Sequence, residues 1–207
     1  DAALTSVYNI DTETITLPTP TKEGYSFSKW IDLDTNNEIK SIVKGTVGDK
    51  KLKALWVANS YKINYTLNKK DAVLPDSADN NRTFGKDITL ATPSKQGYVF
   101  DGWYDNADLT GSAYTSDRLK NLASDVTLYA KWSPAQYKIT YDLGLGSTYA
   151  TMPAYSDTYT VDSPVVLPVP VWAGHTFKSW DLNGTNITTT AGLLGDVTVK
   201  AIWNEDV

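Results

Sequence analysis

The stretch Gly97-Tyr98-Val99-Phe100-Asp101-Gly102-Trp103 decides the architecture of this chain, because it has two counterparts in the sequence. Related stretches begin at Gly24 and Gly174. Each has an aromatic ring directly after the glycine, a Phe two residues later and a Trp three residues beyond that. The copies lie 73 and 77 residues apart (97 minus 24 and 174 minus 97). Self-similarity at such a period predicts an array of related modules.

The residues around this motif repeat as well. A second tryptophan follows each copy, at Trp56, Trp132 and Trp203, in runs of the type Leu-x-Ala-x-Trp or Val-x-Ala-x-Trp. We therefore divide the 207 residues into a first repeat (1–58), a second (59–134) and a third (135–207). Units of about 70 residues enclose only a thin core, in which large aromatic side chains are especially useful.

Composition and charge place the chain among soluble globular proteins, with 41% hydrophobic and 21% charged residues. The formal net charge is −5 and no run of Lys or Arg occurs, which disfavours nucleic acid and other polyanions as partners. There is no cysteine, hence no disulfide, and no apolar run approaches the roughly 20 residues that span a bilayer. We expect no membrane insertion of this segment.

Alternation of apolar and polar residues predicts a mainly β fold. The clearest strands are 61–67, 137–143 and 126–132, and shorter ones are expected at 88–90 and 165–167. Only 116–122 reads as a helix, with Ser116 as its candidate cap, so an α+β class is the alternative.

The motif itself contains an irregularity in its strand pattern. Phe100 and Trp103 differ in parity, so they belong on opposite faces of a regular strand. Either Trp103 packs on the other face, or a bulge at Asp101-Gly102 brings it round to the face of Phe100. We favour the bulge.

The first repeat differs from the other two. Counting back from Gly24 to the counterpart of strand 61–67 passes residue 1, so that strand is missing unless residues 4–10 replace it. This predicts a sheet edge that is open to pairing with another chain. The joints at 57–60 and 133–136 are four residues each, which reach at most about 14 Å and predict limited bending between neighbours.

With Pro-x-x-x-Gly-Tyr-x-Phe-x-x-Trp followed by Leu-x-Ala-x-Trp, the chain resembles the Listeria–Bacteroides repeat, the B-repeat type of internalins. The likeness covers the second and third repeats and most of the first, although His175 replaces the first tyrosine in the third. The resemblance implies small β-grasp-like units in an elongated tandem array. It also implies a cell-wall-anchored or secreted protein of a Gram-positive or Bacteroides-like bacterium, with an adhesive or stalk role and no catalysis.

The recurring residues fit a structural core better than a sugar-stacking platform, because they recur in every unit at strand-compatible spacing. The core set is Gly24, Tyr25, Phe27, Trp30, Trp56, Gly97, Tyr98, Phe100, Trp103, Trp132, Gly174, His175, Phe177, Trp180 and Trp203.

Aromatic residues outside the repeat pattern are better candidates for ligand contact. Trp172 stands out, because its counterparts Lys22 and Lys95 have the character of surface residues. If Trp172 is not a contact residue, we expect it to pack against a neighbouring loop or module. Tyr114, Tyr149 and Tyr155 are weaker candidates.

Catalytic and metal chemistry finds no support in the sequence. His175 is the only histidine and stands where the other repeats have tyrosine, so nucleophilic triads, zinc sites and cofactor sites are not expected. Asp32-x-Asp34-x-Asn36 resembles the start of a calcium loop but lacks its glycine and its bidentate Glu, which favours an ordinary turn. We predict no catalytic residue, no metal site and no cofactor.

The leading functional hypothesis is a non-catalytic tandem-repeat segment that acts as a semi-rigid stalk or spacer, with adhesive contacts as a secondary role. The alternative is a receptor module that binds a host glycan or protein through surfaces between modules. Neighbouring domains of the same polypeptide are expected partners in either case. The sequence leaves the ligand and the oligomeric state open.

Overall fold

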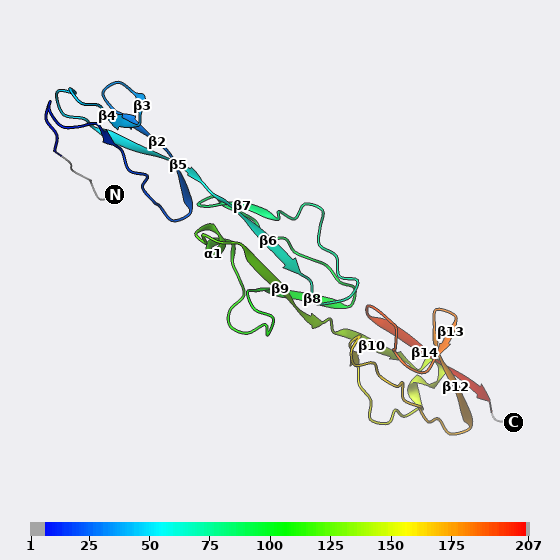
Figure 1. Cartoon of the computed structure of the whole chain (residues 1–207). Helices are drawn as coiled ribbons and strands as arrows, with labels where there is room; N and C mark the ends of the chain where they lie inside the picture. Colours follow the sequence, from blue (N-terminus) through cyan, green and yellow to red (C-terminus); the bar gives the residue numbers. More distant parts are fainter. Residues whose placement is uncertain (1–6, 206–207) are drawn as a thin grey trace. The chain divides into compact units, whose positions relative to one another are not determined.

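A computed structural model of the chain describes residues 7–205 (Figure 1). The chain folds into two compact units that do not coincide with the repeats. The first combines Asp1–Thr66 with Ser77–Leu90 and Tyr114–Leu128, and the second combines Leu67–Asp76, Ala91–Ala113 and Tyr129–Val207. The middle repeat therefore contributes to both units.

The third repeat contains the largest sheet, with five strands in the order β11-β10-β14-β12-β13. Their bounds are β10 Tyr137–Asp142, β11 Thr158–Tyr159, β12 His175–Leu182, β13 Thr185–Ile187 and β14 Val197–Glu205. The first and last long strands, β10 and β14, are parallel neighbours, whereas the other pairs are antiparallel. The last strand of the repeat therefore lies in the centre of the sheet.

The second repeat has the same order without a counterpart of β13. Its four strands run β7-β6-β9-β8, with β6 Ser60–Thr66, β7 Asn81–Thr83, β8 Tyr98–Tyr104 and β9 Val126–Pro134. The strands predicted at 61–67, 126–132 and 137–143 are thus confirmed, and the fold is mainly β with several small sheets.

Among residues 7–205, helical structure is limited to two short turns, α1 Ser116–Lys120 and the 3-10 helix η1 Gly144–Thr148. The expected helix is shorter than 116–122, and its cap is Thr115 rather than Ser116. The Thr115 hydroxyl accepts a hydrogen bond from the backbone N–H of Arg118. Both residues carry a hydroxyl, so the sequence alone did not distinguish them.

The first repeat has a three-stranded sheet of order β3-β2-β5 and a separate pair, β1 with β4. The bounds are β1 Ile15–Thr16, β2 Tyr25–Asp32, β3 Asn37–Ile39, β4 Ser41–Ile42 and β5 Leu52–Ala58. Within residues 7–205 no strand pairs with β5 on the side where β10 pairs with β14, as the prediction of an open edge requires. Of the candidate substitute, residues 7–10 form no strand, and 4–6 lie outside the described residues.

A bulge interrupts the same strand in every repeat. The registers shift between Phe27 and Lys29, between Phe100 and Gly102, and between Phe177 and Ser179. The predicted bulge at Asp101-Gly102 is therefore confirmed. Because the extra residue reverses the alternation, Phe100 and Trp103 lie ring to ring with centroids 5.2 Å apart.

The short strands predicted at 88–90 and 165–167 are not formed. Residues 88–90 pair with no strand, and at 165–167 only Val166 makes an isolated bridge, to Thr189. Prolines follow both segments and have no N–H to donate, so the backbone stays extended without continuing a ladder.

Burial differs between the repeats. Large apolar side chains are buried in the second repeat, including Ile63, Trp103 and Leu128, and in the third, including Ile139 and Trp180. In the described part of the first repeat no large apolar side chain reaches that burial. This difference is expected because the sheet of the first repeat lacks a strand beside β5 that would cover its apolar side chains.

Candidate functional site

The first tryptophan of each motif is tied to the segment that precedes it. The indole N–H groups of Trp30, Trp103 and Trp180 donate to the backbone carbonyls of Pro18, Ala91 and Pro168, at 2.8, 2.7 and 2.6 Å. Trp103 and Trp180 are each 2% exposed, whereas Trp30 is only partly buried. These residues hold each repeat together.

The motif phenylalanine contacts both tryptophans of its repeat. Phe27 lies 5.6 and 5.8 Å from the rings of Trp30 and Trp56, and the two complete repeats show the same arrangement. The second tryptophans Trp132 and Trp203 donate to the carbonyls of Leu67 and Leu143, at the ends of the β6 and β10 regions.

The motif glycines Gly24 and Gly97 contact the following repeat. We call each of them a seat, because a side chain of that repeat packs directly against it. Gly24 has φ +74°, and a Cβ on it would overlap three ring carbons of Phe84, a residue of the second repeat. Gly97 has φ +78°, and its Cβ would lie 2.5 Å from Cγ1 of Val161, a residue of the third repeat. A side chain of the following repeat therefore rests on each glycine, and both contacts lie within a single compact unit.

Backbone hydrogen bonds accompany both seats. The N–H of Asn59 donates to the carbonyl of Gly24, and the N–H of Ala135 donates to that of Gly97, each at 2.9 Å. Asn59 is the only residue between β5 and β6, and Ala135 is one of two between β9 and β10. The joints are thus shorter than the four residues expected from the sequence.

The tyrosine after each seat glycine also faces the following repeat. The ring of Tyr25 meets Phe84 edge to face with centroids 5.3 Å apart, and the hydroxyl of Tyr98 donates to the carboxylate of Asp162. The sequence-based reasoning placed Gly24, Tyr25, Gly97 and Tyr98 in the core of their own repeat. The structure places them against the next one.

We call Phe84 and Val161 the knobs, and sequence reasoning missed both. Each stands thirteen residues before the motif glycine of its own repeat (97 minus 84, 174 minus 161). This recurring apolar position was the signal that could have identified them. At the same spacing the first repeat has Asp11 (24 minus 11).

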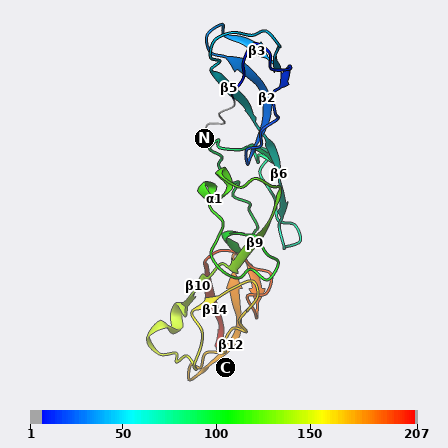
Figure 2. The ribbon, with the colours of Figure 1, turned by 60° about the vertical axis from the view of Figure 1, so that its left-hand side comes forward.

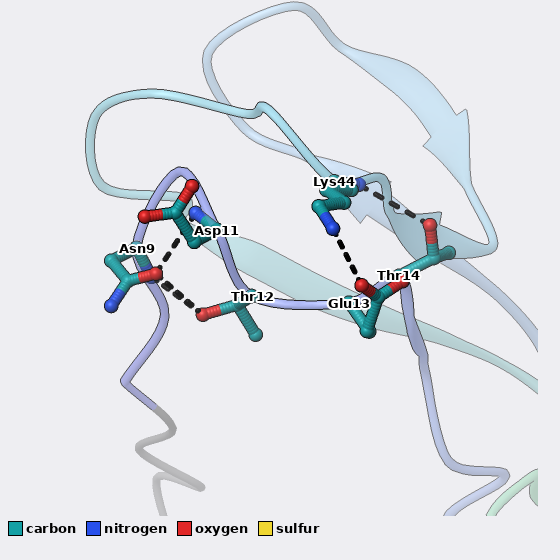
Figure 3. Close-up of polar contacts among 6 residues, drawn as sticks. All are labelled: Asn9, Asp11, Thr12, Glu13, Thr14 and Lys44. Atoms are coloured by element: carbon teal, nitrogen blue, oxygen red, sulfur yellow. Dashed lines mark hydrogen bonds and ion pairs between the residues drawn. The ribbon is translucent and has the colours of Figure 1, made fainter.

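Asp11 belongs to a polar turn that Figure 3 shows in detail. The Asn9 Oδ1 accepts hydrogen bonds from the backbone N–H of Asp11 at 3.0 Å and from the Thr12 hydroxyl at 3.1 Å. Beside it, Lys44 pairs with Glu13 at 2.6 Å, and its backbone N–H donates to the Thr14 hydroxyl. The first repeat therefore has no apolar knob.

The third motif glycine, Gly174, is not a seat among the described residues. Gly174 has φ +76°, yet nothing described lies within 4 Å of where its Cβ would be. His175 stacks on Trp172 with ring centroids 3.5 Å apart, where the first repeat has Lys22 over Tyr25 at 4.3 Å. Trp172 also meets Trp203 edge to face at 5.4 Å.

The candidate contact residues have separate environments. Trp172 is half-buried and packs against Trp203 and the η1 turn, and its role as a contact residue stays a prediction. Tyr155 is exposed and contacts Tyr141 at 4.9 Å. Tyr114 is corrected, because it is buried beneath the guanidinium of Arg118 at 4.2 Å and offers no surface for a ligand.

Arg82 is a further residue that the sequence did not reveal. Its guanidinium is buried and donates to the carbonyls of Leu119, Leu122 and Ser124 at 2.8, 2.6 and 2.6 Å. Burial lowers the pKa of Arg82. In the third repeat the Tyr159 hydroxyl performs the corresponding task by donating to the carbonyl of Gly195 at 2.6 Å. Two different side chains at one position concealed this shared role.

The segment resembling a calcium loop forms a turn. The Asp32 carboxylate accepts the backbone N–H of Asp34 at 2.9 Å and pairs with the Lys50 ammonium at 2.9 Å. The hydrogen bond from Lys50 holds the pKa of Asp32 below its usual value, and Asp32 raises the pKa of Lys50. No cluster of three His, Cys, Asp or Glu suited to a metal ion occurs among residues 7–205.

Comparison with known proteins agrees with the threefold organisation. Residues 2–54, 61–131 and 137–202 match the model of the Listeria-Bacteroides repeat domain. The chain belongs to the Listeria-Bacteroides repeat family. Repeats of this family are typical of bacterial surface proteins and are generally non-catalytic. In the part of the chain that the structure describes, no helix is long and apolar enough to cross a membrane.

Two curated proteins are similar to this chain. Internalin H of Listeria monocytogenes is 31% identical over 63% of this chain and 25% of its own length. A protein of Evansella cellulosilytica, named "Putative membrane protein", is 31% identical over 84% of this chain and 26% of its own length. The chain thus spans about a quarter of these curated relatives.

Proposed function

We propose that this chain is a non-catalytic spacer segment of a bacterial surface protein, located outside the cell on the wall or in secreted form. In this role its repeats extend the reach of a neighbouring domain, and the seats restrict bending at each joint. Similarity to Internalin H supports the location. We further propose that each complete repeat is a β-grasp-like unit, which is supported by the parallel pairing of β10 and β14 in the third repeat and by the same strand order in the second.

One observation carries the spacer proposal. Gly24 and Gly97 leave no room for a Cβ, because Phe84 and Val161 of the following repeats rest on them. Repeats that move independently of one another would not need close packing where they meet. Fully burying an apolar side chain contributes about 1.5–3 kcal/mol, and Phe84 and Val161 are partly buried. A share on the order of 1 kcal/mol favours the docked over the undocked joint about fivefold.

Distance measurements across the first joint test this proposal. The chain has no cysteine, so Thr35→Cys and Ser77→Cys, both at exposed positions, introduce two unique sites for spin labels. Double electron–electron resonance should give one narrow distance distribution, because the knob holds the joint in one arrangement. Phe84→Asp, which introduces the residue found at the knob position of the first repeat, should broaden it. An equally broad distribution in both proteins contradicts a semi-rigid spacer.

A further inference from the structure

The third repeat differs from the other two along one extended segment. Aligned on the motif glycine, the segments read Thr16-Leu-Pro-Thr-Pro-Thr-Lys22, Thr89-Leu-Ala-Thr-Pro-Ser-Lys95 and Val166-Leu-Pro-Val-Pro-Val-Trp172. Three hydroxyl positions and one lysine position have thus become apolar in the third repeat alone. The fold does not require this change, since the other two repeats form the same segment with Thr, Ser and Lys.

The three valines face solvent. Val166, Val169 and Val171 are 79, 62 and 65% exposed. Residues 163–176 contain no Asp, Glu, Lys or Arg, whereas the aligned segments 13–26 and 86–99 contain three charged residues each. The segment is therefore free of Asp, Glu, Lys and Arg over its whole length, and residues 164–173 are all apolar.

The neighbouring η1 turn extends this surface. Leu145 and Tyr149 are 88 and 70% exposed, and the Tyr149 ring lies parallel to that of Trp172 with centroids 6.3 Å apart. The backbone of Thr151, three residues after the end of η1, pairs with Val171 through hydrogen bonds of 2.8 and 2.9 Å. We call Leu145, Tyr149, Val166, Val169 and Val171 the apolar strip.

Single exposed apolar residues are common, but contiguous ones of several hundred Å² mark interaction sites. Strand addition does not suit the strip, because Pro168 and Pro170 lack the N–H groups that a ladder needs. A polyanion finds no cation on residues 163–176. The chemistry of the strip fits another uncharged, apolar protein surface.

We propose that the apolar strip is the contact by which two copies of this chain associate, each strip packing on the other about a twofold axis. Symmetric pairs are the commonest soluble assemblies, and an isologous interface needs one self-complementary patch.

The area is adequate for such a pair. If each strip side chain exposes on the order of 100 Å² of apolar surface, the five residues together supply about 500 Å². A specific interface buries about 800 Å² per partner, of which about 65% is apolar in homodimers. The strip thus provides the apolar share, and its surroundings supply the polar rim.

The net charge of the chain predicts how salt changes the strength of the association. The chain has a formal net charge of −5, so two copies repel one another, while residues 163–176 add no charge to the contact. Screening this repulsion should strengthen association between about 0.05 and 0.5 M salt. A contact held by ion pairs would weaken over the same range.

Sedimentation velocity of the full chain at increasing concentration tests the proposal. We expect a reversible monomer–dimer equilibrium with a Kd in the range of about 1–100 µM, as a small interface gives. The variant Val166→Thr, Val169→Thr, Val171→Thr restores the residue type of the first repeat at exposed positions, and should weaken association at least about tenfold. Circular dichroism should show that the variant remains folded.

A matched control uses exposed valines outside the strip. Val57, Val73 and Val99 are 59, 59 and 54% exposed, and their simultaneous replacement by Thr makes the same chemical change elsewhere. This control should dimerise like the unmodified chain. A chain that stays monomeric to about 1 mM overturns the proposal, as does equal weakening in both triple variants. Dimers that persist unchanged in the strip variant, or weaken with salt, place the contact elsewhere and also overturn it.

Discussion

Gly24→Ala should destabilise the first joint more than the same change at Gly174 destabilises the third repeat. The two positions are a natural pair, because their φ angles are +74° and +76°. Only Gly24 has a neighbour, the Phe84 ring, in the space that the new methyl group would occupy. The backbone strain is therefore common to both substitutions. The difference between their losses of unfolding free energy measures the contribution of the contact between Gly24 and Phe84.

The magnitudes follow from these two contributions. A non-glycine residue in the left-handed region costs about 1–2 kcal/mol, so Gly174→Ala should lower the free energy of unfolding by that amount. Overpacking adds about 1–3 kcal/mol at Gly24, unless the Phe84 ring leaves the seat and forfeits its burial instead. In a Phe84→Ala background, Gly24→Ala should cost no more than Gly174→Ala does. The coupling between the two sites would then be about 1–3 kcal/mol.

Urea unfolding followed by amide signals resolved for each repeat measures these differences. The repeats need not unfold together, so a signal for each of them is required. If Gly24→Ala and Gly174→Ala cost the same, or if Phe84→Ala leaves the cost at Gly24 unchanged, the seat does not contribute to stability and the reasoning is refuted.

Three other expectations concern individual side chains. Trp180→Ala should cost about 3–5 kcal/mol in urea unfolding, and Trp30→Ala less, because Trp180 is 2% exposed and Trp30 only partly buried. Arg82→Met should cost about 3 kcal/mol or more in the same assay, because three carbonyls lose a charged donor; a cost below about 1 kcal/mol would show that water replaces it. The lowered pKa of Asp32 means that its pairing stabilises the folded first repeat above its unfolded pKa of about 3.9, and that this contribution is lost as pH falls through the lower folded pKa. Acid titration of Lys50→Met should therefore show a smaller loss of stability below about pH 4 than the unmodified chain, and an equal loss would contradict the assigned pair.

The sequence predicted the repeats and their strands because periodicity is a property of local sequence. The bulge before Trp103 was also predictable, since the parity of Phe100 and Trp103 cannot be reconciled with a regular strand that buries both. The short strands at 88–90 and 165–167 failed because β propensity does not show whether a partner strand is available.

The seats could not be recognised from recurrence alone. A glycine and tyrosine that recur in every repeat look the same whether they pack within a unit or against the next one. Phe84 and Val161 recur thirteen residues before the motif glycine of their own repeat, but this spacing does not show that they contact the glycine of the preceding repeat. The role of Arg82 was not recognised for a similar reason. In the third repeat a different side chain, Tyr159, donates the corresponding hydrogen bond to a backbone carbonyl.

The central claim is that neighbouring repeats are held together by a side chain seated on a motif glycine. Backbone ¹⁵N relaxation of the full chain tests it most directly. Figure 2 shows β5 and β6, the two strands whose motions would be compared, in a second view. Seated joints predict that amides in β5 and β6, on the two sides of the first joint, report one common rotational diffusion, and that Phe84→Asp separates them. Independent tumbling of the two strands in the unmodified chain would contradict the account.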